Sequence, residues 1–79
     1  MEIKIEDIKR IFENIGKNDI DENTDNLVEN GIIDSIDIIN LIQEIETCYG
    51  ILVDFDYINT ENLKNFQTIK NMIDEIVSN

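Results

Sequence analysis

Ser35 is the residue whose type and setting most clearly suggest chemistry. It follows a turn containing Gly31, comes directly after Asp34, and opens a segment with helical periodicity. This pattern places its hydroxyl in the first turn of a helix. There, backbone N–H groups lack partners and the helix dipole has its positive end. Such a position suits a group that carries a phosphate, although a plain serine N-cap is the more common explanation.

The types of residue that are missing limit the possible chemistry. The chain has no histidine, so a Ser–His triad, a Cys–His pair and histidine metal sites are excluded. The carboxylates of Asp34 and Asp37 are weak bases at neutral pH if their pKa values are ordinary. Cys48 has no cationic neighbour in the sequence, and we interpret it as a packing or rim residue. Ser35 is therefore better interpreted as the target of another enzyme than as a nucleophile.

A partial calcium-loop pattern begins at Asp19. Asp19, Asp21 and Asn23 match the first three oxygen positions of an EF-hand loop. The glycine expected at the sixth position is Thr24, and the glutamate expected at the twelfth is Asn30. We therefore predict no metal-ligating residues, although the acidic segment could attract divalent cations loosely.

The charge of the chain is strongly negative and unevenly distributed. Six Lys and Arg oppose 18 Asp and Glu, which gives a net charge of −12. No Lys or Arg lies between residues 18 and 63, a segment that holds twelve of the acidic residues. This balance argues against nucleic acid and anionic membranes as partners. Acidic residues can simply keep a small protein soluble, but the exclusion of every cation from the middle favours a surface that faces a partner.

Length and composition indicate one small domain over residues 1–79. A chain of 79 residues with 42% hydrophobic residues can form one modest core. No apolar run approaches transmembrane length, and the charged segment Met1–Glu13 does not resemble a signal peptide. One cysteine permits no internal disulfide. We expect a cytoplasmic monomer that does not insert into membranes.

Hydrophobic spacing predicts three main helices. They cover residues 2–15, 35–49, and 66 or 67 to 77, with Gly16 and Gly50 as C-terminal caps. The last two helices are joined by an extended connector at 51–53 and a short helical turn. The sequence thus predicts an all-α bundle of three main helices plus one short helix.

Two further features surround the predicted central helix. The long loop 17–34 carries apolar residues that should pin it to the core, namely Ile20, Leu27, Val28, Ile32 and Ile33. Asp34 or Ser35 should cap the helix, and Asp34 with Asp37 resembles a capping box in which Asp replaces Glu. Ile36 and Ile39 fall beside the core stripe, so they are either exposed partner contacts or satellite core.

The chain resembles the acyl carrier proteins and their peptidyl and D-alanyl relatives. The resemblance rests on Gly31-Ile-Ile-Asp-Ser-Ile-Asp37, on the amphipathic segment to Ile51, and on Glu61–Ile73. It implies an acyl-carrier-protein-like up-down bundle. It also implies that a phosphopantetheinyl transferase attaches 4′-phosphopantetheine from coenzyme A to Ser35. The thiol of this arm would hold an acyl or aminoacyl group as a thioester, and the protein itself would not be an enzyme.

The resemblance also implies where partner enzymes dock. The central helix commonly serves as the recognition helix of this family, and loading and processing enzymes would meet it with basic patches. Docking should then weaken as salt rises. The residues that match such contacts are Asp34, Ile36, Asp37, Ile39, Glu44 and Glu46.

Departures from the family pattern leave the cargo open. A frequent glutamate of the central helix is Asn40, and a frequent proline after it is Asp54. The Gly-Ile-Ile-Asp-Ser sequence is more similar to stand-alone carriers of specialised pathways than to carriers of bulk fatty-acid synthesis. Fatty acyl, polyketide, peptide and D-alanyl cargoes all remain open. The alternative is an acidic helical interaction module without a prosthetic group, in which Ser35 is an ordinary cap.

Overall fold

The computed structural model describes residues 2–78, and within this range it contains only helices. These are α1 (Ile5–Asn14), α2 (Ser35–Tyr49), the short 3-10 helix η1 (Phe55–Tyr57) and α3 (Phe66–Ser78). No strand occurs in the described chain. The predicted all-α fold, with three main helices and one short one, is confirmed.

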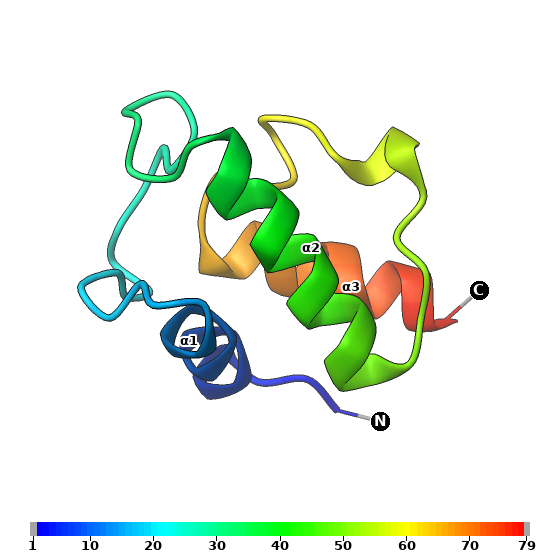
Figure 1. The fold of residues 1–79 in the computed structure, drawn as a ribbon. Coiled ribbons are helices and arrows are strands. Elements are labelled where there is room, and N and C mark those ends of the chain that lie inside the picture. The colour runs from blue at the N-terminus through cyan, green and yellow to red at the C-terminus, as the bar shows by residue number, and fades with distance from the viewer. Residues whose placement is uncertain (1, 79) are drawn as a thin grey trace.

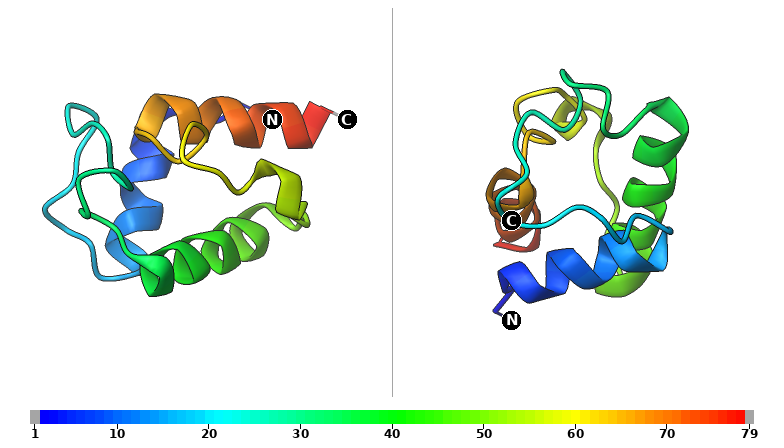
Figure 2. Two further views of the ribbon diagram at one scale, coloured as in Figure 1. Left: turned by 90° about the horizontal axis from the view of Figure 1, so that it is seen from above. Right: turned by 90° about the vertical axis from the view of Figure 1, so that its left-hand side faces the viewer.

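The helices form a bundle in which α1 lies across the other two. Figure 1 looks almost along the axis of α1, whereas α2 and α3 are seen from the side. Figure 2 shows that α2 and α3 begin at the same end of the molecule and run in the same general direction. The segment between them therefore travels back along the bundle through η1. Because α1 packs against both α2 and α3, it holds the bundle together.

The first helix is shorter than the sequence pattern predicts. The Asp7 carboxylate accepts a hydrogen bond from the Lys4 backbone N–H at 2.9 Å, so the helix begins at Ile5. Ile3 is buried although it precedes the helix, and the apolar spacing alone cannot distinguish this from an earlier helical turn. The prediction of a helix from residue 2 was therefore wrong at its start.

The predicted glycine cap of α1 is present. Gly16 has a φ of 85°, in the left-handed region, which lets the chain turn directly after the helix. Its N–H donates to the Glu13 carbonyl oxygen, and the Lys17 N–H donates to the Phe12 carbonyl oxygen at 2.8 Å. This pair of bonds is a Schellman motif, and it directs the chain into the long loop 17–34.

The core consists entirely of apolar side chains. The rings of Phe12 and Phe66 stack with their centroids 5.0 Å apart and so join α1 to α3. No polar or charged residue in the described chain is buried. The buried residues are Ile3, Ile8, Ile11, Phe12, Ile20, Leu27, Ile33, Leu41, Ile42, Ile45, Val53, Leu63, Phe66, Ile69, Met72 and Ile73.

The loop 17–34 is attached to the core as predicted. Ile20, Leu27 and Ile33 are buried, and Val28 and Ile32 are partly buried against them. The Leu27 N–H donates to the Lys64 carbonyl oxygen at 3.0 Å, which ties this loop to the segment before α3. A loop held this way delivers the start of α2 to a fixed place.

The connector after α2 contains the predicted short helical turn, η1. Residues 51–53 form no helix or strand, and the buried Val53 donates its N–H to the Glu46 carboxylate at 3.0 Å. The Asp54 carboxylate then caps η1 by accepting the Asp56 N–H at 2.9 Å. The connector is thus a defined structure whose backbone is fixed at two successive points.

The stacked phenylalanines should dominate stability. We expect Phe12→Ala to lower the free energy of unfolding by about 3–5 kcal/mol, because a large buried side chain leaves a cavity. The exposed Phe55 offers a matched control, and Phe55→Ala should change stability by less than about 0.5 kcal/mol. Urea denaturation followed by circular dichroism measures both. Equal losses in the two variants would contradict this packing.

Candidate functional site

Asp34, and not Ser35, caps helix α2. The Asp34 carboxylate accepts the Asp37 backbone N–H at 2.9 Å, and the Asp37 carboxylate accepts the Asp34 N–H at 3.0 Å. These reciprocal bonds form the predicted capping box with Asp in place of Glu. Ser35 is therefore the first residue inside the helix, and the helix does not need its hydroxyl as a cap.

The Ser35 side chain is exposed and uncommitted. Its hydroxyl forms no hydrogen bond with any of residues 2–78, and the residue lies at the surface. It stands at the positive end of a helix of 15 residues. Gly31, with a φ of 69°, turns the chain just before this point. The arrangement presents a free hydroxyl where added negative charge would be stabilised.

Lys17 lies against the start of α2, a contact that the sequence analysis missed. Its ammonium is 3.1 Å from the Asp37 carboxylate, on the same oxygen that accepts the Asp34 N–H. It also donates to the Ile32 carbonyl oxygen at 3.4 Å. The long loop separates Lys17 from Asp37 in sequence, so no short pattern signals the pair. Lys17 thus places a cation directly against a carboxylate in the acidic middle of the chain.

The Asp37 carboxyl has a pKa below its ordinary value of 3.8. The main cause is the hydrogen bond from the Asp34 backbone N–H; partial burial opposes it, and the Lys17 ammonium lowers the pKa further. A carboxylate with a lowered pKa is a poor proton acceptor. Asp37 therefore gives Ser35 little help as a base, and its carboxylate is already engaged within the protein.

Two isoleucines form an exposed apolar strip beside Ser35. Ile36 is 67% exposed and Ile39 is 56% exposed. Three residues apart in a helix, they lie on the same side of α2. The sequence left open whether they belong to a satellite core, and their exposure rules out that interpretation. They remain available for contact with another molecule.

The other two predicted acidic contacts lie away from Ser35. Glu44 accepts hydrogen bonds from the Asn14 amide at 3.0 Å and from the Cys48 thiol at 3.3 Å. Glu46 accepts the Val53 N–H, as described above. At a helical rise of about 1.5 Å per residue, they are roughly 14 and 17 Å along α2 from Ser35. The structure therefore gathers Asp34, Ile36, Asp37 and Ile39 around the serine, whereas Glu44 and Glu46 fasten α2 to its neighbours.

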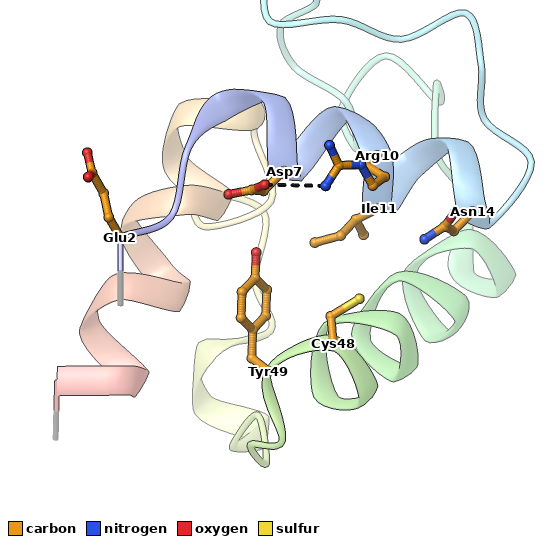
Figure 3. A pocket seen from close by; sticks show the side chains of 7 residues that line it. All are labelled: Glu2, Asp7, Arg10, Ile11, Asn14, Cys48 and Tyr49. Atoms are coloured by element: carbon orange, nitrogen blue, oxygen red, sulfur yellow. Dashed lines mark ion pairs between the residues drawn. The ribbon is translucent and has the colours of Figure 1, made fainter.

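A pocket of about 250 Å³ opens between α1 and the end of α2 (Figure 3). The Tyr49 hydroxyl points toward Asp7, whose carboxylate is 3.7 Å from the Arg10 guanidinium. Burial, and then the charge of Asp7, raise the pKa of Tyr49. The pocket lies roughly 20 Å along α2 from Ser35, so it is not part of the serine site. Its lining residues are Glu2, Asp7, Arg10, Ile11, Asn14, Cys48 and Tyr49.

The partial calcium-loop pattern forms a turn. The Asp21 carboxylate accepts the Asn23 N–H at 2.8 Å, and the Thr24 hydroxyl accepts the Asp21 N–H at 3.2 Å. Among residues 2–78, no group of three acidic or cysteine side chains is arranged to hold a metal ion. In the same range, no helix combines the length and apolar character needed to cross a membrane.

Comparisons of the chain with protein-family models, with curated proteins and with solved structures give no match. The candidate site accordingly consists of Ser35, its capping residues Asp34 and Asp37, the cation of Lys17, and the apolar strip of Ile36 and Ile39.

The capping box should make stability depend on pH in the acid range. Because the folded-state pKa of Asp37 is below 3.8, its contribution is complete above about pH 4 and is lost as pH falls further. We expect Asp37→Ala to lower the free energy of unfolding by about 1–2 kcal/mol at neutral pH, because its carboxylate loses the hydrogen bond from the Asp34 N–H and the contact with Lys17. This difference from the wild type should narrow below pH 3.5.

Urea unfolding at a series of pH values measures the effect. Lys17→Met is the control, since the Asp34 N–H is the larger cause of the lowered pKa and would remain. It should preserve most of the pH dependence. A difference between Asp37→Ala and wild type that stays constant from pH 7 to pH 2 would contradict the assignment.

The Cys48 thiol should react slowly for an exposed cysteine. Burial, followed by the Glu44 carboxylate, raises its pKa above the ordinary value of 9.0. The rate of alkylation by iodoacetamide should therefore reach half its maximum above pH 9.0. Glu44→Gln should move this midpoint to lower pH, whereas Glu46→Gln, which removes a carboxylate that bonds Val53 instead, should not. Identical midpoints in wild type and Glu44→Gln would refute the role of Glu44.

Proposed function

We propose that this protein is a carrier of acyl or aminoacyl groups. The group would be held as a thioester on a 4′-phosphopantetheine arm attached to Ser35. Partner enzymes of fatty-acid, polyketide, peptide or D-alanylation-type biosynthesis would load and use it. The observation that carries the proposal is the free, exposed hydroxyl of Ser35 in a helix whose cap is supplied by Asp34. This removes the main structural explanation for a serine at this place.

The attachment requires a second protein. The Ser35 oxygen would attack the phosphorus of coenzyme A that bears the pantetheine arm. A phosphodiester forms, the pyrophosphate bond breaks, and 3′-phosphoadenosine 5′-phosphate leaves. The serine proton must pass to a base. This chain has no histidine, and the nearby Asp37 has a lowered pKa. A phosphopantetheinyl transferase would supply that base.

The surroundings of Ser35 favour the product of this reaction. The phosphodiester carries one negative charge, and the N-terminus of α2 offers unpaired N–H groups and a positive dipole. The Lys17 ammonium, held against Asp37, offsets part of the local negative charge. These features support a phosphate on Ser35 despite the acidic composition of the chain.

Delivery of the cargo would depend on tethering and docking. A flexible arm raises the effective concentration of its cargo at the active site of any enzyme that binds the carrier. Ile36 and Ile39 would provide the apolar contact beside the arm, and Asp34, which remains exposed, would face basic groups of the partner. We place the protein in the cytoplasm as a monomer, where its one cysteine would stay reduced.

Mass spectrometry after incubation with coenzyme A and a purified broad-specificity phosphopantetheinyl transferase tests the proposal. We expect the wild type to gain the mass of one phosphopantetheine group and Ser35→Ala to gain none. Ser78→Ala is the matched control. Ser78 donates its hydroxyl to the Asp74 carbonyl oxygen at 2.7 Å, and this variant should be modified like the wild type.

A wild type that stays unmodified with several transferases would overturn the carrier function. The acidic interaction module without a prosthetic group would then be the better interpretation. If Ser35→Ala still gained the phosphopantetheine mass, Ser35 would not be the point of attachment, but the carrier function would stand.

A further inference from the structure

The connector between α2 and η1 exposes two large apolar side chains. Leu52 is 85% exposed and Phe55 is 82% exposed, more than any other large hydrophobic residue of the described chain. We call these two residues the connector patch. Neither was singled out by the sequence pattern, in which each is one of several apolar residues after Gly50. Large apolar side chains this open to solvent are typical of contact sites.

The fold of the connector holds this patch outward. Between the two exposed residues, Val53 is buried and its N–H is bound by the Glu46 carboxylate. The Asp54 carboxylate caps η1, and the Ile58 N–H donates to the Phe55 carbonyl oxygen at 3.0 Å. With the backbone fixed on both sides, the patch cannot turn inward without breaking these bonds. Its exposure is a property of the folded chain.

The connector patch is separate from the serine site. Ser35 opens α2, whereas the connector leaves its other end, and η1 lies well away from the start of α2 in Figure 1 and in the left view of Figure 2. An interface centred on Ile36 and Ile39 would therefore not cover the connector unless it extended along the whole helix.

The charges around the patch indicate what could cover it. Asp54 and Asp56 are exposed beside it, and the Asp56 carboxylate forms no hydrogen bond or ion pair with residues 2–78. No Lys or Arg lies between residues 18 and 63. A second copy of this chain would bring like charges together, and an anionic membrane would also be repelled. A surface that combines apolar groups with Lys or Arg is complementary in both respects.

We propose that the connector patch is a docking site for a protein partner whose surface presents an apolar hollow bordered by Lys or Arg side chains. Phe55 and Leu52 would fill the hollow, and Asp54 and Asp56 would face the basic border. This inference goes beyond the carrier function because it requires no modification of Ser35.

A synthetic amphipathic helical peptide of leucine and lysine serves as the probe for such a surface. In a titration of the uniformly ¹⁵N-labelled protein, we expect the largest amide shift changes at residues 51–58. Fluorescence anisotropy should show that Leu52→Ser/Phe55→Ser weakens binding about tenfold, because two apolar contacts are lost. Asp56→Lys should also weaken binding, and its effect should diminish at high salt. Glu13→Lys, at an exposed glutamate of α1 outside both surfaces, is the charge-matched control for Asp56→Lys and should weaken binding less than Asp56→Lys does.

Three outcomes would overturn the proposal. The first is an equal affinity for a peptide in which every leucine is replaced by serine, since binding would then depend on charge alone. The second is a loss of affinity in Ile36→Ser/Ile39→Ser and none in the connector variant. The third is a dimer in sedimentation experiments that dissociates in Leu52→Ser/Phe55→Ser, which would show that a second copy covers the patch. None of these outcomes bears on whether Ser35 accepts a phosphopantetheine arm.

Discussion

The candidate site depends on the pair of hydrogen bonds between Asp34 and Asp37. This capping box binds the backbone N–H groups of Asp34 and Asp37, and it leaves the hydroxyl of the intervening Ser35 without a capping role. If Ser35 were the cap, its hydroxyl would be needed by the helix, and any modification would cost helix stability. Because the cap precedes Ser35 and its partner follows it, the helix start stays intact whatever happens at the serine.

The rest of the chain fixes this helix start in space. Loop 17–34 has no regular structure, but its apolar residues are buried, and Lys17 joins its beginning to both Ile32 and Asp37. The Lys9 ammonium holds the loop from α1 by donating to the carbonyl oxygens of Asn18 and Ile20. Two of the chain's six basic side chains thus donate hydrogen bonds to backbone carbonyl oxygens of this loop.

Local patterns predicted what is local in this fold. The bounds of α2, its capping box and the burial of Leu27 follow from spacing and residue type within one segment. The ion pair of Lys17 could not be predicted, because it joins residues that only the folded loop brings together. The exposure of Phe55 was also beyond the sequence, since an apolar residue in a short turn can face either side. Glu44 and Glu46 were predicted to be partner contacts for a similar reason. Their bonds to Asn14 and Val53 join segments that only the fold brings together, so the sequence does not reveal them.

Most of the predicted acidic contacts on α2 have structural partners within the chain. Under the proposed carrier function, partner recognition would therefore depend more on apolar side chains than on these carboxylates. A partner that competes for Asp37 must displace Lys17, and one that competes for Glu46 must release the connector. A contact with Ile36 or Ile39 breaks no such bond, because more than half of each residue is exposed. Long-range attraction would still come from the net charge of −12, which needs no single free carboxylate. The net charge would therefore mainly set the rate of association with a partner, and contacts with the exposed isoleucines would mainly set the affinity.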